Sequence, residues 1–267
     1  MLGFISFSSG SSGNCYFLYT ENDGLMIDAG IGIRTLKKSF RDFGLAMNSV
    51  HHLINTHDHA DHIKCVGSIS HELHLPVYAT ELVHKGIDHN YCVTRKVNPA
   101  DRHLVEPRHP MQLGDFLVTP FPVPHDSSDN VGYMIEVQGH TFCIITDAGE
   151  VTEEMGTYIE QANYLVIEAN HDTEMLMNGP YPAHLKGRIN STTGHLNNKA
   201  CGEAIAQHMT EQLKSVWLCH LSEENNHPEL ARKTVEAILR GYGIIAGKDF
   251  QLEVLKRTMP TGIFQLL

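Results

Sequence analysis

Short apolar runs alternate with helix-like patterns along the whole chain, and polar turn residues separate them. The apolar runs at 15–20 and 25–28 flank Glu21-Asn22-Asp23-Gly24, and an Asp-Gly pair between two such runs predicts a β-hairpin. A helical pattern follows over about 34–43, and the next predicted strand covers 52–55. Strands that alternate with helices in this way indicate an α/β protein.

The rest of the chain continues in two groups, each consisting of strands followed by helices. Further strands are expected at 77–79, 116–120, 131–137, 141–146, 164–169, 215–218 and 250–256, and further helices at 80–89, 152–162, 198–213 and 229–239. Two such groups favour two packed sheets with helices on the outer faces, an αββα sandwich, although strand pattern alone also fits other α/β layouts. Because there is no linker-like shift in composition and no internal repeat, we expect a single domain over 1–267. We interpret the serine- and glycine-rich segment 8–13 as a loop.

Charge and cysteine content narrow the possible functions. The formal net charge is -11, which argues against a broad basic face that wraps duplex DNA but is compatible with a phosphate substrate bound through metal ions. The six cysteines lie far apart and several lie in apolar runs, so we expect reduced core residues. The N-terminus has no signal-peptide pattern, and no apolar run is long enough to span a membrane. These features predict a cytoplasmic protein with no membrane partner.

Histidine is unusually frequent, with nineteen residues, and four candidate metal ligands fall within His57-Asp58-His59-Ala60-Asp61-His62. This segment follows the strand predicted at 52–55, so its loop can direct His57 and His59 to one ion, and Asp61 and His62 to a second. Two ions about 3.5–4 Å apart can share a hydroxide and hold both ends of a displacement reaction. A histidine-rich surface turn that binds metal adventitiously is the alternative, and it explains the density of the pattern less well.

The remaining ligands are expected at the ends of later strands. Asp147 and His220 each end an apolar run, and His125 follows Phe121-Pro122-Val123-Pro124. A lone histidine at a strand end is more often solvated, but these three together complete two ligand sets. Histidine and carboxylate ligands without cysteine suit zinc, manganese or iron.

With these residues the chain resembles the metallo-β-lactamase-fold hydrolases over essentially its whole length. The resemblance implies the αββα fold and two divalent metal ions. The implied ligands are His57, His59 and His125 for the first ion, Asp61, His62 and His220 for the second, and Asp147 as a bridge. His227 is a rival for the position of His220, ranked lower because it lies at a proline-bounded helix start. Segments 9–14, 168–172, 194–198 and 220–226 are similar to the YycJ/WalJ group, whose members are described as 5′-to-3′ exonucleases acting on DNA.

The resemblance also implies catalytic roles for three residues. Asp61 would orient the metal-activated hydroxide, His195 would protonate the leaving oxygen or hold the phosphate, and Glu168 would orient His195. Alternatively, His195 is only a residue at a helix start, before a capping Asn197. Asp28 is expected to fasten the histidine loop, and Asp58 to hydrogen-bond a ligand imidazole.

Several polar residues have open interpretations. Ser11, Ser12 and Asn14 either contact a phosphate or form a plain turn, and His171 either lines the site or is exposed at a helix start. His184, Lys186 and Arg188 form a small basic cluster that contacts a nucleic-acid backbone or is merely solvated.

The sequence therefore predicts a dinuclear metal-dependent phosphodiesterase, more narrowly a 5′-to-3′ DNA exonuclease. The alternative is a small-molecule hydrolase whose substrate is a cyclic phosphodiester, a thioester or a lactam. A secreted lactamase would carry a signal peptide, and a helical C-terminal substrate domain needs more than the roughly fifty residues that follow His220. A binding protein that has lost catalysis is disfavoured because the whole ligand set is present. The oligomeric state is left open.

Overall fold

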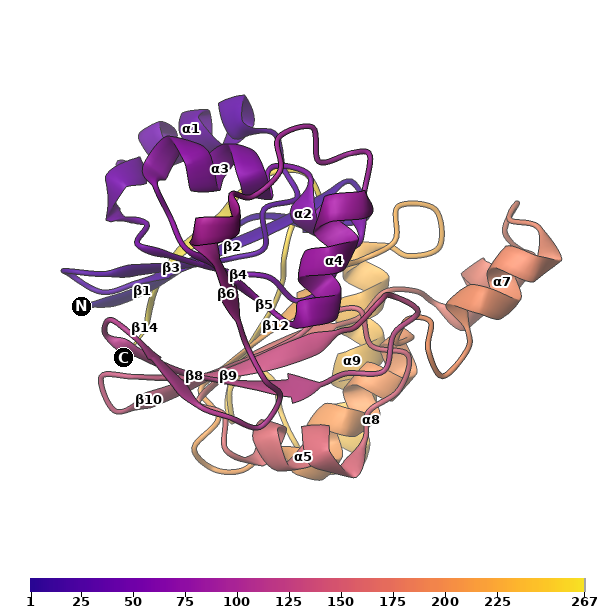
Figure 1. Cartoon of the computed structure of the whole chain (residues 1–267). Coiled ribbons are helices and arrows are strands. Elements are labelled where there is room, and N and C mark those ends of the chain that lie inside the picture. The colour runs from indigo at the N-terminus through magenta and orange to yellow at the C-terminus, as the bar shows by residue number, and fades with distance from the viewer. Residues whose placement is uncertain (267) are drawn as a thin grey trace. The chain divides into compact units, whose positions relative to one another are not determined.

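The computed structural model describes residues 1–266 and divides the chain into two compact units. The first unit comprises residues 1–120, 127–130 and 256–266, and the second comprises 121–126 and 131–255. Each unit has a hydrophobic core in which helices pack against strands (Figure 1). The single domain over 1–267 stays a prediction.

The first sheet is mixed and has seven strands in the order β14-β1-β2-β3-β4-β5-β6. Its strands are β1 (Leu2–Gly10), β2 (Gly13–Tyr19), β3 (Gly24–Ile27), β4 (His52–Ile54), β5 (Val77–Ala79), β6 (Arg102–Leu104) and β14 (Thr261–Leu266). Neighbours from β14 to β3 are antiparallel, whereas neighbours from β3 to β6 are parallel. Parallel neighbours need crossover connections, and four helices supply them. These are α1 (Ile33–Asp42), α2 (Ala60–Ile63), α3 (Val66–Leu73) and α4 (Glu81–His89).

Apolar side chains of α1, α3 and α4 pack against one face of this sheet. The Phe40 ring of α1 lies 4.7 Å from that of Phe7 and 5.1 Å from that of Phe17, measured between centroids. All three rings are buried, and each buried aromatic side chain contributes roughly 1.5–3 kcal/mol through the hydrophobic effect. This packing attaches α1 to strands β1 and β2.

The second sheet is also mixed, with seven strands in the order β13-β12-β11-β10-β9-β8-β7. Its strands are β7 (Met111–Leu113), β8 (Phe116–Pro122), β9 (Val131–Val137), β10 (His140–Ile145), β11 (Tyr164–Glu168), β12 (Ser215–Cys219) and β13 (Gln251–Val254). Strands β10 to β13 are parallel neighbours, and α5 (Glu153–Glu160), α8 (Asn198–His208) and α9 (Pro228–Gly241) connect them and pack in the second core. Two shorter helices, α6 (Thr173–Asn178) and α7 (Ala183–Ile189), precede α8.

Most elements lie where the hydrophobic pattern places them, and the exceptions have local causes. Between the predicted strands at 131–137 and 141–146, Gln138 and Gly139 form a turn with φ values of 51° and 78°, which are typical of a type I′ hairpin. The interpretation of 8–13 as a loop is wrong, because β1 continues to Gly10 and β2 begins at Gly13. The hydroxyls of Ser8 and Ser9 are satisfied inside this hairpin by Arg257 O and the Tyr16 hydroxyl. No strand was predicted after 250–256, but β14 follows there and pairs with β1.

The cysteine prediction is confirmed for the part of the chain that the structure describes. All six cysteines are free, and five of them are buried. None of the helices within residues 1–266 has the length and apolar character that a membrane crossing requires.

Candidate metal centre

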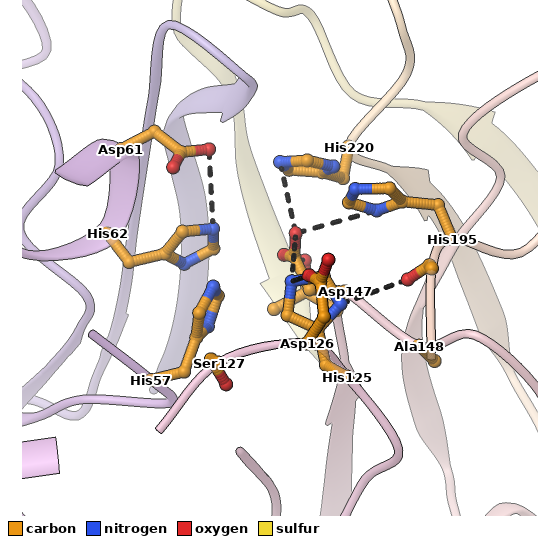
Figure 2. Close-up of polar contacts among 12 residues, drawn as sticks. His57, Asp61, His62, His125, Asp126, Ser127, Asp147, Ala148, His195 and His220 are labelled. Carbon is orange, nitrogen blue, oxygen red and sulfur yellow. Dashed lines mark hydrogen bonds and ion pairs between the residues drawn. The ribbon is translucent and has the colours of Figure 1, made fainter. Parts of the chain in front are cut away.

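The histidine motif of the first unit begins just after β4. His57 lies on the connecting loop, His59 directly precedes α2, and Asp61 and His62 fall in that short helix. The ring centroids of His57 and His62 are 4.1 Å apart, and those of His57 and His59 are 4.8 Å apart. Asp61 Oδ2 lies 3.6 Å from His62 Nε2 (Figure 2). The structure therefore brings together all four ligands predicted from this motif.

Asp28 fastens the motif, as predicted. Its buried carboxylate accepts hydrogen bonds from the Thr56 backbone N–H at 2.9 Å, the Thr56 hydroxyl at 2.9 Å and His62 Nδ1 at 2.7 Å. A carboxylate on Nδ1 keeps the proton there and leaves the lone pair on Nε2, which is the form of histidine that binds a metal.

Asn14 has a role that the sequence analysis left open. Its buried amide nitrogen lies 2.9 Å from His62 Nε2 and 3.3 Å from Asp61 Oδ2, and it donates to Gly10 O at 3.1 Å. Asn14 therefore contacts two predicted ligands and donates to the carboxylate of one of them, Asp61, whereas Ser11 and Ser12 form the exposed turn between β1 and β2. The only signal in the sequence is the position of Asn14 beside that turn.

Asp58 does not contact a ligand imidazole, so that prediction is wrong. Its carboxylate accepts hydrogen bonds from the Ser128 backbone N–H at 3.2 Å and the Ser128 hydroxyl at 2.5 Å. Asn90 Nδ2 donates to Asp58 O at 3.1 Å, and a Cβ at Gly86 of α4 would lie 1.9 Å from Asp58 Oδ2. Asp58 thus attaches the histidine loop to α4 and to Ser128.

In the second unit, parallel pairing of β10, β11 and β12 brings their carboxyl ends to one edge of the sheet. Asp147, Glu168 and His220 lie at these ends, and His195 lies shortly before α8. One ligand atom from each of these four side chains can be chosen so that all four atoms lie within 4.8 Å of one another. Four residues that the sequence indicated separately therefore form one cluster in the structure.

Asp147 is the centre of this cluster (Figure 2). Its Oδ1 lies 3.5 Å from His220 Nε2, 3.6 Å from His195 Nδ1 and 3.8 Å from His125 Nε2. These separations are too long for good N–H···O hydrogen bonds. Ligands bound to one ion at about 2.0–2.2 Å lie roughly 3–3.6 Å apart, so the 3.5 Å between Asp147 Oδ1 and His220 Nε2 and the nature of these donors fit a divalent metal ion.

Glu168 holds two imidazoles of the cluster. It is fully buried, and its Oε1 accepts hydrogen bonds from His195 Nδ1 at 2.8 Å and His220 Nδ1 at 3.1 Å. Its Oε2 accepts from the backbone N–H groups of Ala148 at 2.9 Å and Leu196 at 3.2 Å. Burial alone would raise the pKa of Glu168, but the charge of His195 and the two imidazole hydrogen bonds outweigh it and hold that pKa below its usual range. Glu168 therefore stays ionised and directs His220 Nε2 toward Asp147.

His195 lies beside two carboxylates of the cluster, those of Glu168 and Asp147. Burial alone would lower its pKa, but the charge and hydrogen bond of Glu168, with a smaller effect of Asp147, raise that pKa above the ordinary histidine value. Nδ1 of His195 makes both contacts with these carboxylates, so Nε2 is the ring nitrogen that points away from them. The side chain is 19% exposed, which leaves it accessible to a substrate.

Backbone conformation singles out the same strand ends. Asp28, Asp147 and His220 have φ values of 60°, 54° and 52°, in the left-handed region that non-glycine residues seldom adopt. Each lies within two residues of the end of a strand. Strained residues of this kind persist where the surrounding structure fixes a functional side chain.

The remaining histidines can also be placed. His125 Nδ1 donates to Gly194 O at 2.9 Å, which directs its Nε2 toward Asp147. His227 caps α9 by accepting from the Glu229 N–H, so the geometry favours its rival His220. His171 is fully buried, and the interpretation of an exposed helix-start residue is wrong.

Comparison with known proteins identifies relatives that match nearly the full length of the chain. The family model for the Beta-lactamase superfamily domain matches residues 24–221. The chain is 34% identical over 262 residues to exodeoxyribonuclease YycJ of Bacillus anthracis, covering 98% of each protein. It is 33% identical over 245 residues to exodeoxyribonuclease WalJ of Streptococcus pneumoniae serotype 2, covering 92% of this chain and 91% of WalJ.

Solved structures share the fold at lower sequence identity. The metallo-beta-lactamase fold protein YhfI from Bacillus subtilis matches with a TM-score of 0.70 and 17% identity, over 98% of this chain and 99% of YhfI. Zn²⁺-bound PqqB from Methylobacterium extorquens matches with a TM-score of 0.69 and 15% identity, over 97% of this chain and 100% of PqqB.

Proposed function

The chain belongs to the beta-lactamase superfamily and is a metal-dependent hydrolase, and we propose that it is a 5′-to-3′ DNA exonuclease. The predicted metallo-β-lactamase fold class, with two mixed sheets flanked by helices, and the resemblance to the YycJ/WalJ group are both confirmed. DNA as the substrate and the polarity of cleavage belong to the proposal, which full-length relatives named exodeoxyribonucleases support.

We propose that the chain binds two divalent ions, with zinc, manganese and iron as the candidates. The proposed ligands are His57, His59 and His125 for the first ion, Asp61, His62 and His220 for the second, and Asp147 as a bridge. The contacts of Asp28 with His62 and of Glu168 with His220 support this assignment, because each fixes the proton on Nδ1 and leaves Nε2 as a donor. Bound ions would supply a water that ionises near neutral pH and positive charge for the phosphoryl oxygens.

The observation that carries the phosphodiester assignment is the pair of imidazoles on Glu168. Hydrolysis of a DNA phosphodiester releases a strongly basic alkoxide oxygen, which needs a proton as it departs. His195 can supply it through Nε2, because the raised pKa that Glu168 gives this side chain favours its protonated form. Asp61, which Asn14 holds in place, would accept a hydrogen bond from the attacking water. A cytoplasmic location stays a prediction.

Purified metal-replete protein should be tested on a linear 5′-phosphorylated duplex that is labelled at either the 5′ or the 3′ end. We expect the 5′ label to be released at once as a mononucleotide and the 3′-labelled strand to shorten progressively. Both signals should disappear with a chelator and in the His59→Ala variant.

Two results would overturn the proposal. Wild-type protein that cleaves neither this DNA nor bis-p-nitrophenyl phosphate, or a His59→Ala variant that cleaves it equally well, would show that the site is not a nuclease centre. Cleavage of a cyclic phosphodiester, thioester or lactam without DNA cleavage would instead establish the small-molecule alternative.

A further inference from the structure

Residues 177–193 form a segment of the second unit that we call the arm. None of these seventeen described residues is buried. It contains α7, none of whose residues is buried, and Figure 1 shows this helix projecting from the body formed by α8 and α9. A helix this short obtains little stability from its own hydrogen bonds and normally depends on packing of an apolar face. The arm therefore has a surface available for a partner.

The charge of the arm differs from that of the rest of the protein. The chain carries 31 acidic residues against 20 basic ones, yet no Asp or Glu occurs between Glu174 and Glu203. The same stretch contains Lys186, Arg188 and Lys199, and the first two lie on α7. A basic element in an acidic protein is an electrostatic contact site for a polyanion such as a nucleic-acid backbone.

The base of the arm is attached to the catalytic half-site of the second unit. Arg188 forms an ion pair with Asp126, the residue after the proposed ligand His125. Gly194 O accepts the hydrogen bond from His125 Nδ1, and Ile189 O accepts one from the His195 backbone N–H at 2.9 Å. A Cβ at Gly194 would lie 2.2 Å from Ile189 O, so the close approach at this base requires glycine. The base of the arm is thus in direct contact with His125 and His195 or with the residues next to them.

We propose that the arm binds the phosphate backbone of the DNA strand under degradation, outside the scissile bond. This inference rests on the proposed nuclease function and adds a substrate-binding element to it. Lys186 is the principal contact residue, because Arg188 is already paired with Asp126, while the ammonium group of Lys186 makes one hydrogen bond, to Met177 O at 2.7 Å. Its other two N–H donors can bind phosphate oxygens.

The test compares Lys186→Glu with Lys233→Glu, the same change of charge on α9, where Lys233 is 75% exposed and pairs with Glu229. Steady-state cleavage of a labelled 5′-phosphorylated DNA by metal-replete enzyme should show KM raised about tenfold in Lys186→Glu and less than twofold in Lys233→Glu. In Lys186→Gln, the slope of log kcat/KM against log salt concentration should become shallower by roughly 0.7–0.9, the loss of one phosphate contact. In Lys186→Glu, the ratio of kcat/KM for DNA to kcat/KM for bis-p-nitrophenyl phosphate should fall below that of the wild type. In Lys186→Arg, this ratio should equal that of the wild type.

The outcomes separate the two proposals. DNA cleavage that Lys186→Glu and Lys233→Glu change equally, with folding of both verified by thermal melting, overturns the role of the arm and leaves the nuclease function standing. If wild-type protein cleaves no DNA, the nuclease function fails, and fluorescence anisotropy of a labelled oligonucleotide decides about the arm. Weaker binding of the oligonucleotide by Lys186→Glu than by Lys233→Glu supports the role of the arm. Equal binding by the two variants, or undetectable binding by the wild type, overturns that role.

Discussion

Substitution of Glu168 by glutamine keeps the size of the side chain but replaces one of its two acceptor atoms by an NH₂ donor. Glu168 accepts four hydrogen bonds, two from imidazoles on Oε1 and two from backbone N–H groups on Oε2. A glutamine oxygen can serve only one of these pairs, and the NH₂ group then faces the donors of the other pair. If it faces the imidazoles, Nδ1 of His220 must become an acceptor and the proton moves to Nε2. The lone pair that a metal ion requires is then lost.

The structure sets the size of this effect. Two hydrogen bonds to a buried charged group are lost, and each contributes about 1.5–3 kcal/mol. We therefore expect the free energy of unfolding of the metal-free protein to fall by about 3–6 kcal/mol at most, since a neutral amide costs less to bury than a carboxylate. Loss of a carboxylate partner behind a ligand histidine should weaken metal binding by about 10–100-fold.

Urea unfolding of the metal-free protein and competition with a chromophoric chelator measure these two quantities. Glu160→Gln is a matched control, because Glu160 also accepts a hydrogen bond from a histidine Nδ1, that of His208 at 2.9 Å, but is half exposed. It should change the free energy of unfolding by less than about 1 kcal/mol and leave metal affinity unaltered. If Glu168→Gln binds metal within threefold of wild type and unfolds like the control, Glu168 does not orient the ligand and the reasoning is refuted.

Three further predictions can be tested with the same methods. Gly86→Ala should destabilise the protein by about 1–3 kcal/mol in urea unfolding, because the new Cβ would lie 1.9 Å from Asp58 Oδ2. Gly187→Ala on α7 is the control: no atom lies within 4 Å of its new Cβ, and the change should stabilise the protein by up to about 1 kcal/mol. Equal effects of the two would contradict the close packing of the histidine loop against α4. Asn14→Ala should lower kcat on DNA by about tenfold or more through loss of its contact with Asp61, and wild-type kcat would exclude that role. Burial lowers the pKa of His84 below its ordinary value, so the stability that its neutral form contributes is present above about pH 6.5 and is lost as the pH falls through the folded pKa. In metal-free protein the free energy of unfolding should therefore fall below about pH 6.5, and His84→Gln should make this fall less steep. An unchanged slope in the variant would count against a role of His84.

The metal ligands proposed from the sequence have local signals, and the structure places those of each unit near one another. A dense histidine motif after a strand and polar residues at the ends of apolar runs, such as Asp147 and His220, need no knowledge of tertiary structure. The double contact of Glu168 with His195 and His220 could not be predicted in detail, because it depends on the pairing of β11 with β12.

The parts of the fold that were missed lack the patterns on which prediction depends. Strand β14 contains Gly262 and directly follows Pro260, which break its apolar alternation. Helix α7 has no buried face, so no helical period of apolar residues marks it. Asp58 was assigned to an imidazole because neighbouring residues in the motif are ligands, whereas its partner Ser128 lies seventy residues away in the sequence.

Titration of metal-free protein with Mn²⁺ or Zn²⁺, with release of the 5′ label from DNA as the readout, tests the central proposal most directly. We predict that activity is absent without metal, rises as ions are added, and reaches a plateau at two equivalents per chain. Full activity in excess chelator, or no release of the label at any metal concentration, would contradict the assignment of a two-metal DNA exonuclease.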